Sequence, residues 1–104
     1  GYTGYCASKA AVDHMTRVLA IELARHRIRV NCVAPGYIHT ELIDSLVRDG
    51  KFSMEAIARR TPQRRLGTGD DVARAVCYVA SDDAGFMTGQ VVTVDGGWTA
   101  YGYL

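Results

Sequence analysis

The chain has 104 residues, of which 48% are hydrophobic, so its length suffices for one small domain with a core of its own. Its 12 basic and 11 acidic side chains leave a formal net charge of +1, and no basic block interleaved with aromatic residues is present. This balance excludes the usual nucleic-acid-binding surface, so we expect no nucleic-acid partner. No apolar run approaches the length of a membrane span, and we expect no membrane association.

The cysteines and histidines are scattered, without the spacing that metal sites show. The cysteines include no Cys-x-x-Cys pair and predict buried free thiols in a reducing compartment, which favours a cytoplasmic location: Cys6, Cys32 and Cys77. The histidines predict surface or locally hydrogen-bonded imidazoles, and no metal site is expected among them: His14, His26 and His39.

The first predicted element is a long amphipathic helix over about residues 5–24, because apolar residues recur there at helical spacing: Val12, Met15, Leu19 and Leu23. The alanines around them permit either the close approach of a helix from a second subunit or ordinary packing on a sheet. The helix is expected to end near residues 25–27, where three cationic or imidazole side chains suit the negative end of the helix dipole.

Tyr5 and Lys9 are four residues apart and are therefore expected on one face of this helix. A tyrosine hydroxyl has an ordinary pKa of ~10, and a neighbouring cation favours the phenolate, so such a pair suits general acid–base catalysis. The same spacing also occurs in ordinary pairs on solvated helix faces.

A short run of β-branched and small apolar residues, 28–34, predicts a parallel strand covered on both faces. Pro35 and Gly36 end this strand at its carboxyl end, which is where open α/β sheets place their ligands. A plain strand-terminating turn is the alternative interpretation.

Residues 37–67 are predicted to be irregular, with two short helices around Leu42–Val47 and Met54–Ala58 separated by the breaker Asp49-Gly50. An insertion of this length between a strand and the next main helix is typical of a functional or mobile segment, although a surface excursion is the alternative. The arginines at its end predict a solvated face or a contact with an anionic substrate: Arg59, Arg60, Arg64 and Arg65.

Thr68 and Asp71 resemble a capping box that opens a helix through Val79, and residues 81–85 end it. Residues 90–94 predict the last strand, and Asp95-Gly96-Gly97 turns out of it. A strand–helix–strand order requires a right-handed crossover with parallel pairing, so the fold class is α/β and the chain contains one unit of a doubly wound parallel sheet.

Four groups of residues, in this order, resemble the classical short-chain dehydrogenase/reductase family from residue 1 to about residue 98: Tyr5-x-Ala7-Ser8-Lys9; Arg29–Gly36 followed by Ile38 and Thr40; Pro62, Arg65 and Gly67; and Thr88-Gly89-Gln90 leading into Val94–Gly97. The resemblance implies that residues 1–104 are the C-terminal part of a single Rossmann-like domain with a substrate lid at about 37–67. The N-terminal dinucleotide-binding part, with its glycine-rich turn, is then expected outside this chain.

The resemblance also implies an oxidoreductase that uses NAD or NADP to interconvert a secondary alcohol and a ketone. In it, Tyr5 is the general acid–base and also a cofactor-binding residue, and Lys9 stabilises the phenolate and binds the nicotinamide ribose. Further cofactor contacts are implied for the turn after the first strand: Pro35, Gly36, Ile38 and Thr40. Ser8 is expected to be a small packing residue, because the catalytic serine of the family lies upstream of the tyrosine.

The partners implied are a small alcohol or ketone and further copies of the chain, in a homo-oligomer that is a dimer or a tetramer. The substrate stays open between a sugar, a polyol, a 3-oxoacyl thioester and a hydrophobic ketone. The aromatic tail is expected to pack locally rather than reach a neighbouring subunit's site: Trp98, Tyr101 and Tyr103.

A different class of function is a catalytically inactive truncated fragment, or an interaction module that docks on an intact relative. Such a chain lacks half of the cofactor site, and the strand before Pro35 would present an open edge. Gly1 stands where a complete gene product begins with methionine, which favours a longer enzyme over this alternative.

Overall fold

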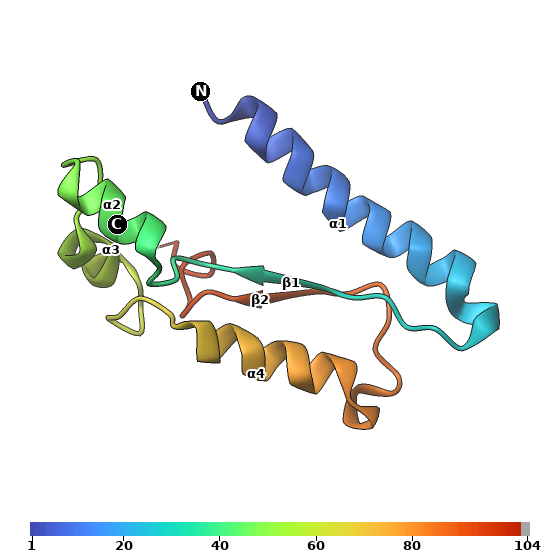
Figure 1. Ribbon diagram of the computed structural model, residues 1–104. Helices are drawn as coiled ribbons and strands as arrows, with labels where there is room; N and C mark the ends of the chain where they lie inside the picture. Colours follow the sequence, from blue (N-terminus) through green and yellow to red (C-terminus); the bar gives the residue numbers. More distant parts are fainter. Residues whose placement is uncertain (103–104) are drawn as a thin grey trace. The chain divides into compact units, whose positions relative to one another are not determined.

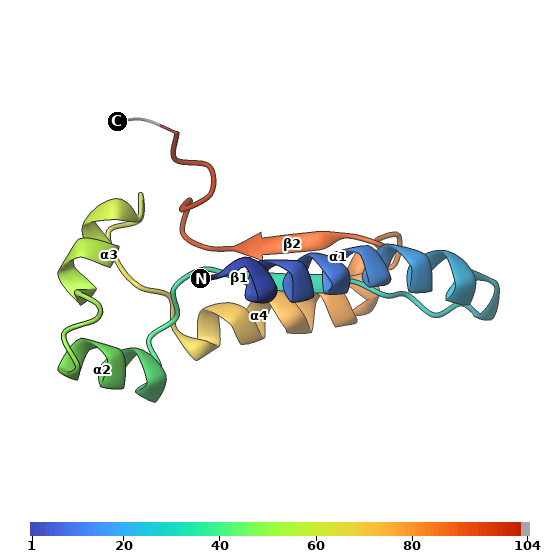
Figure 2. The same ribbon diagram turned by 90° about the horizontal axis from the view of Figure 1, so that it is seen from above.

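The structure is a computed structural model and describes residues 1–102. Figures 1 and 2 trace its elements in two views at right angles, in the order α1 (Thr3–Leu23), the 3-10 turn η1 (Ala24–His26), β1 (Cys32–Pro35), α2 (Glu41–Arg48), α3 (Met54–Arg60), α4 (Gly69–Ala80), the 3-10 turn η2 (Asp82–Ala84) and β2 (Val91–Val94). The predicted α/β class and the order of the elements are confirmed. None of the helices within residues 1–102 has the length and apolar character that crossing a membrane requires.

The described chain divides into two compact units, and the boundary falls within β1, within α4 and within β2. The first unit holds residues 1–33 and 77–92, and the second holds residues 34–76 and those from 93 onward. Buried apolar side chains are few and are divided between the units: Ala20, Val79 and Ala84 in the first, Ile43 and Ile57 in the second. The single core expected from length and composition is therefore not found among the described residues.

β1 and β2 pair as neighbours in a two-stranded sheet, side by side in Figure 1. The Cys32 N–H donates to the Gln90 carbonyl (2.8 Å) and the Gly36 N–H donates to the Val94 carbonyl (3.0 Å). Both strands advance by the same number of residues between these two bonds, so the pairing is parallel, as predicted.

β1 begins later than the predicted strand over 28–34, because the segment facing residues 30 and 31 is irregular and β2 begins only at Val91. The Val30 N–H donates to the Thr88 hydroxyl (3.1 Å), and the Asn31 side chain binds the Met87 carbonyl (2.9 Å) and the Gln90 N–H (3.1 Å). One backbone bond remains there, from the Gly89 N–H to the Val30 carbonyl (2.7 Å), and side-chain bonds replace the rest of the regular ladder. The predicted cover on both faces is also wrong for this chain, since β1 is only partly buried.

Packing of α1 differs from its predicted apolar pattern. Its buried residues are Thr16 and Ala20, and Ala20 lies against Gly89 in the same unit. Two of the four predicted apolar positions, Val12 and Met15, are exposed, Met15 to 53%, and Val18 and Ile21 are exposed as well. The other two predicted positions, Leu19 and Leu23, are half-buried. The smallest residues therefore make the closest internal contact, and only part of the predicted apolar stripe is covered.

The C-terminal end of α4 is held by Arg29, a contact that the sequence analysis did not anticipate. The guanidinium donates to the carbonyl groups of Val79 (2.7 Å), Ala80 (3.2 Å), Ser81 (2.9 Å) and Met87 (3.3 Å). The last carbonyls of a helix lack partners within the helix, and a cation also suits its negative end. Arg29 therefore acts as a cap across the fold.

The second unit contains the two short helices predicted between residues 37 and 67. The Thr40 hydroxyl caps α2 by accepting from the Ile43 N–H (3.4 Å), and the Ser53 hydroxyl caps α3 by accepting from the Ala56 N–H (3.2 Å). The predicted capping box of α4 is also present, because the Thr68 N–H donates to the Asp71 carboxylate (2.7 Å) and the Asp71 N–H donates to the Thr68 hydroxyl (3.3 Å).

Two side-chain predictions are wrong. The cysteines are free, but Cys6 and Cys77 are exposed and Cys32 is half-buried, because the elements that carry them contribute few buried positions. Ser8 is exposed rather than packed, and its hydroxyl donates to the Tyr5 carbonyl one turn earlier (2.7 Å). The imidazoles of His26 and His39 are locally bonded as predicted, to Arg25 (3.0 Å) and Asp44 (2.9 Å).

Candidate functional site

Tyr5 and Lys9 share one face near the start of α1, as their spacing predicts. The Lys9 Nζ atom lies 5.5 Å from the centroid of the Tyr5 ring, and Tyr5 is 62% exposed. Helix spacing alone produces this pairing, because residues four apart are neighbours on the helix surface. An exposed phenol beside an ammonium group can donate a proton or, as the phenolate, accept one.

Gly36 ends β1 at a point where two segments approach closely. A side-chain Cβ at this position would lie 2.7 Å from the Asp95 Cβ and 2.8 Å from its Cα, which no residue other than glycine tolerates without displacement. The chain can therefore turn sharply after Pro35 while staying bonded to the Val94 carbonyl. Pro35 and Gly36 lie where the predicted turn places them.

Ile38 presents two free backbone groups. It forms an isolated parallel bridge with Gly67, in which the Gly67 N–H donates to the Tyr37 carbonyl (2.9 Å) and the His39 N–H donates to the Gly67 carbonyl (2.8 Å). In such a bridge the N–H and C=O of the central residue point away from its partner. Neither group of Ile38 makes a hydrogen bond to any residue within 1–102, so one donor and one acceptor remain for a ligand.

Thr40 lies two residues further on and is exposed. Its hydroxyl oxygen accepts the α2 capping bond, which leaves the hydroxyl hydrogen available as a donor. Thr40 therefore serves as a helix cap and can bind a ligand at the same time.

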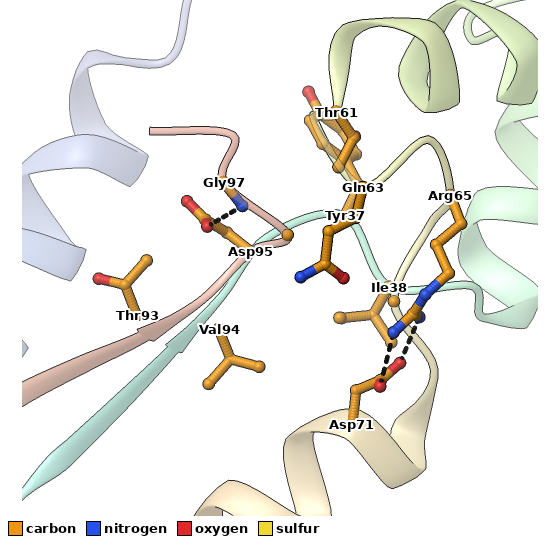
Figure 3. Close-up of a pocket in the computed structure, with 12 residues that line it drawn as sticks. Tyr37, Ile38, Thr61, Gln63, Arg65, Asp71, Thr93, Val94, Asp95 and Gly97 are labelled. Atoms are coloured by element: carbon orange, nitrogen blue, oxygen red, sulfur yellow. Dashed lines mark hydrogen bonds and ion pairs between the residues drawn. The ribbon is translucent and has the colours of Figure 1, made fainter. Parts of the chain in front are cut away.

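A cavity of about 410 Å³ adjoins this loop (Figure 3). Three segments supply its lining: Tyr37 and Ile38; Thr61, Gln63, Arg65, Gly67 and Asp71; and residues 93–97. Arg65 and Asp71 form a two-pronged ion pair at its edge, with Nη1–Oδ2 2.7 Å and Nη2–Oδ1 2.9 Å. Hydrogen bonding from Arg65, then from Thr68, lowers the pKa of the Asp71 carboxyl well below its usual range. Arg65 is thus engaged within the chain.

On the opposite wall the Asp95 carboxylate closes the turn after β2. It accepts from the Gly97 N–H (2.8 Å), the Thr99 N–H (2.8 Å) and the Thr99 hydroxyl (2.7 Å), and the first of these bonds is drawn in Figure 3. These bonds, the Thr99 hydroxyl foremost, lower the pKa of Asp95. The turn was predicted from Asp95-Gly96-Gly97, but the part played by Thr99 was missed, because the usual aspartate turn extends only two residues along the chain.

The predicted site residues fall into two groups. The first unit contains Tyr5 and Lys9 on α1, and the second unit brings the remaining ones together in one loop: Pro35, Gly36, Ile38 and Thr40. Within residues 1–102 no group of three or more histidine, cysteine, aspartate or glutamate side chains is arranged to hold a metal ion.

Comparison with known proteins identifies the family. A family model described as enoyl-(acyl carrier protein) reductase matches residues 1–99. The (2S)-[(R)-hydroxy(phenyl)methyl]succinyl-CoA dehydrogenase subunit BbsD of Thauera aromatica is 50% identical over 98 residues, which are 93% of this chain and 38% of that protein. The chain thus spans well under half the length of this curated relative.

Two solved structures show the same fold with a nicotinamide cofactor bound. ElxO with NADP bound has a TM-score of 0.83 and 38% identity, over 93% of this chain and 39% of that one. A gluconate 5-dehydrogenase from Burkholderia cenocepacia, in complex with NADP and tartrate, has a TM-score of 0.85 and 38% identity, over 95% of this chain and 38% of that one. The chain belongs to the short-chain dehydrogenase/reductase family of oxidoreductases, whose members use NAD or NADP.

Proposed function

We propose that the protein containing this chain interconverts a secondary alcohol and a ketone with NAD(H) or NADP(H), and that Tyr5 is its general acid–base. The observation that carries the proposal is the exposed Tyr5 phenol with the Lys9 ammonium one helical turn away, in a chain of this family. The dehydrogenase names of two relatives support the reaction class.

In alcohol oxidation the Tyr5 phenolate accepts the hydroxyl proton, and in ketone reduction the Tyr5 phenol donates a proton to the carbonyl oxygen. Lys9 would hold the nicotinamide ribose through its ammonium group, a positive charge of the kind that favours the phenolate form of a neighbouring tyrosine. The bound nicotinamide supplies the chemistry of hydride acceptance and donation.

The loop after β1 fits the carboxamide of a nicotinamide. A primary carboxamide has both donor and acceptor groups, and Ile38 offers an N–H and a C=O that bond to no residue within 1–102. Thr40 adds a hydroxyl donor, and Pro35 with Gly36 shapes the turn that exposes these groups. We assign these four residues to cofactor binding on that ground.

We further propose that residues 1–104 form the C-terminal part of a single Rossmann-type domain and that residues 37–67 are a lid that excludes water from the reacting atoms. The protein is a cytoplasmic homo-oligomer, a dimer or a tetramer. The exposed apolar side chains of α1 support assembly, since Ile21 is 80% exposed.

Replacing Tyr5 by Phe in the full-length protein tests the central assignment. We expect kcat to fall by about 10²-fold or more, because the proton-transferring hydroxyl is removed, while the dissociation constant for the nicotinamide stays measurable. Tyr2→Phe is the matched control, since Tyr2 is an exposed tyrosine just before the same helix. Unchanged turnover in Tyr5→Phe would remove Tyr5 from this role.

A further inference from the structure

The C-terminal end of α3 is packed against the turn that follows β2. The Gln63 N–H donates to the Gly96 carbonyl (3.2 Å), and a Cβ at Gly96 would lie 2.9 Å from the Thr61 methyl group. Thr61 is only 4% exposed. The end of this helix and the turn are therefore in direct contact.

Arg60, the last residue of α3, reaches across this contact to the segment 98–101. Its guanidinium donates to the carbonyl groups of Trp98 (3.1 Å) and Tyr101 (3.5 Å). The guanidinium carbon also lies 4.4 Å from the centroid of the Trp98 ring and 5.1 Å from that of Tyr101. A planar guanidinium can stack on an aromatic face and at the same time donate hydrogen bonds in its own plane, which the ammonium group of lysine cannot do.

Trp98 in turn contacts the loop after β1. Its ring lies 4.7 Å from the ring of Tyr37, and Tyr37 contacts Phe52 edge to face at 6.0 Å. Tyr37 directly follows Gly36, and Phe52 lies between α2 and α3. One series of contacts thus joins Arg60 and the helices at 41–60 to the residue beside the proposed carboxamide site.

We propose that Arg60 is a positioning residue that anchors the segment 41–60 on Trp98 and Tyr101, and that this anchor sets the affinity for the alcohol or ketone without touching it. The inference rests on the proposed function, because it assigns substrate affinity to the predicted lid. The stacked guanidinium lowers the free energy of the anchored arrangement, so a substrate that needs this arrangement binds more tightly.

Arg60→Ala in the full-length protein tests the anchor. We expect KM for the alcohol or ketone to rise about tenfold, the loss that one stacked and hydrogen-bonded guanidinium accounts for, while kcat changes less than about twofold. Limited chymotryptic digestion should cut the 41–60 segment several times faster. Arg60→Lys keeps the charge but loses the planar stack, so its substrate KM and its digestion rate should lie between those of the wild type and of Arg60→Ala.

Arg59→Ala is the matched control, because it removes an arginine from the same helical turn that is exposed and makes no side-chain bond within residues 1–102. Arg60→Ala behaving like Arg59→Ala, or faster digestion with an unchanged substrate KM, would overturn the inference. If Arg60→Ala does not fold, Trp98→Leu removes the aromatic partner instead. The substrate KM and the rate of chymotryptic digestion of this variant are then expected to rise in the same way. Retained turnover in Tyr5→Phe contradicts only the proposed catalytic role. The digestion rate of Arg60→Ala then still shows whether Arg60 anchors the segment 41–60.

Discussion

At the scale of single residues, Gly36 shows how a missing side chain sets the spacing of two segments. The end of β1 approaches the Asp95 backbone more closely than any Cβ permits, and the carboxamide-binding groups proposed at Ile38 follow two residues later. Asp95 itself is held by three hydrogen bonds to its own turn, so it cannot move aside easily. The shape of the loop therefore depends on this glycine.

Gly36→Ala should lower the free energy of unfolding by about 1–3 kcal/mol, because an added methyl forces the backbone at Asp95 to shift. Urea unfolding of the full-length variant measures this. Gly69→Ala is the control, since a Cβ there meets nothing within 4 Å, and its stability should stay within about 1 kcal/mol of the wild type. Equal stability of the two variants would show that the contact at Asp95 relaxes without cost.

At the scale of elements, the helix ends depend on contacts both near and far in sequence. Thr40, Ser53 and the Thr68/Asp71 box cap their own helices and can be read from neighbouring residues. The C-terminal end of α4 instead depends on Arg29, which is 50 residues before Val79 in the sequence. Local capping is therefore predictable, whereas this cap requires the fold.

Arg29→Ala should destabilise the full-length protein by about 2 kcal/mol, because several half-buried carbonyl groups lose a charged donor together. Thermal or urea unfolding gives the value. Arg74→Ala removes an exposed arginine from the same helix and is expected to have little effect. If the two variants unfold alike, water replaces the Arg29 bonds fully and the capping role is wrong.

At the scale of the whole molecule, two carboxylates couple stability to pH. The pKa values of Asp71 and Asp95 are lowered in the folded chain by hydrogen bonds to the ionised form. A lowered folded-state pKa contributes stability above the unfolded pKa of about 4, and this contribution is lost as the pH falls through the folded values. The protein should therefore lose stability below about pH 4.

Urea unfolding between about pH 6 and about pH 2 measures this loss. Asp71→Asn and Asp95→Asn should each lower stability at neutral pH and reduce the dependence on acid, whereas Asp83→Asn, at an exposed residue of η2, should leave that dependence as in the wild type. An unchanged acid dependence in both site variants would show that other groups control it.

Much of the fold and part of the site follow from the sequence, because they depend on neighbouring residues. Helical spacing predicted α1 and the Tyr5–Lys9 pair, capping residues predicted α4, and Pro35-Gly36 predicted the end of β1. These features are local, since hydrogen bonds along a helix and the fixed dihedral angles of proline act within a few residues.

Tertiary structure alone decided the contacts between distant residues. It showed that Arg29 caps α4, that Asp95 requires a glycine at position 36, and that Arg60 stacks on Trp98 and Tyr101; Tyr103, the remaining aromatic of the predicted tail, lies outside the described residues. It also corrected the burial of the cysteines and the length of β1. Burial and long-range pairing depend on which surfaces meet in three dimensions, and the pattern of residues along one segment does not contain that information.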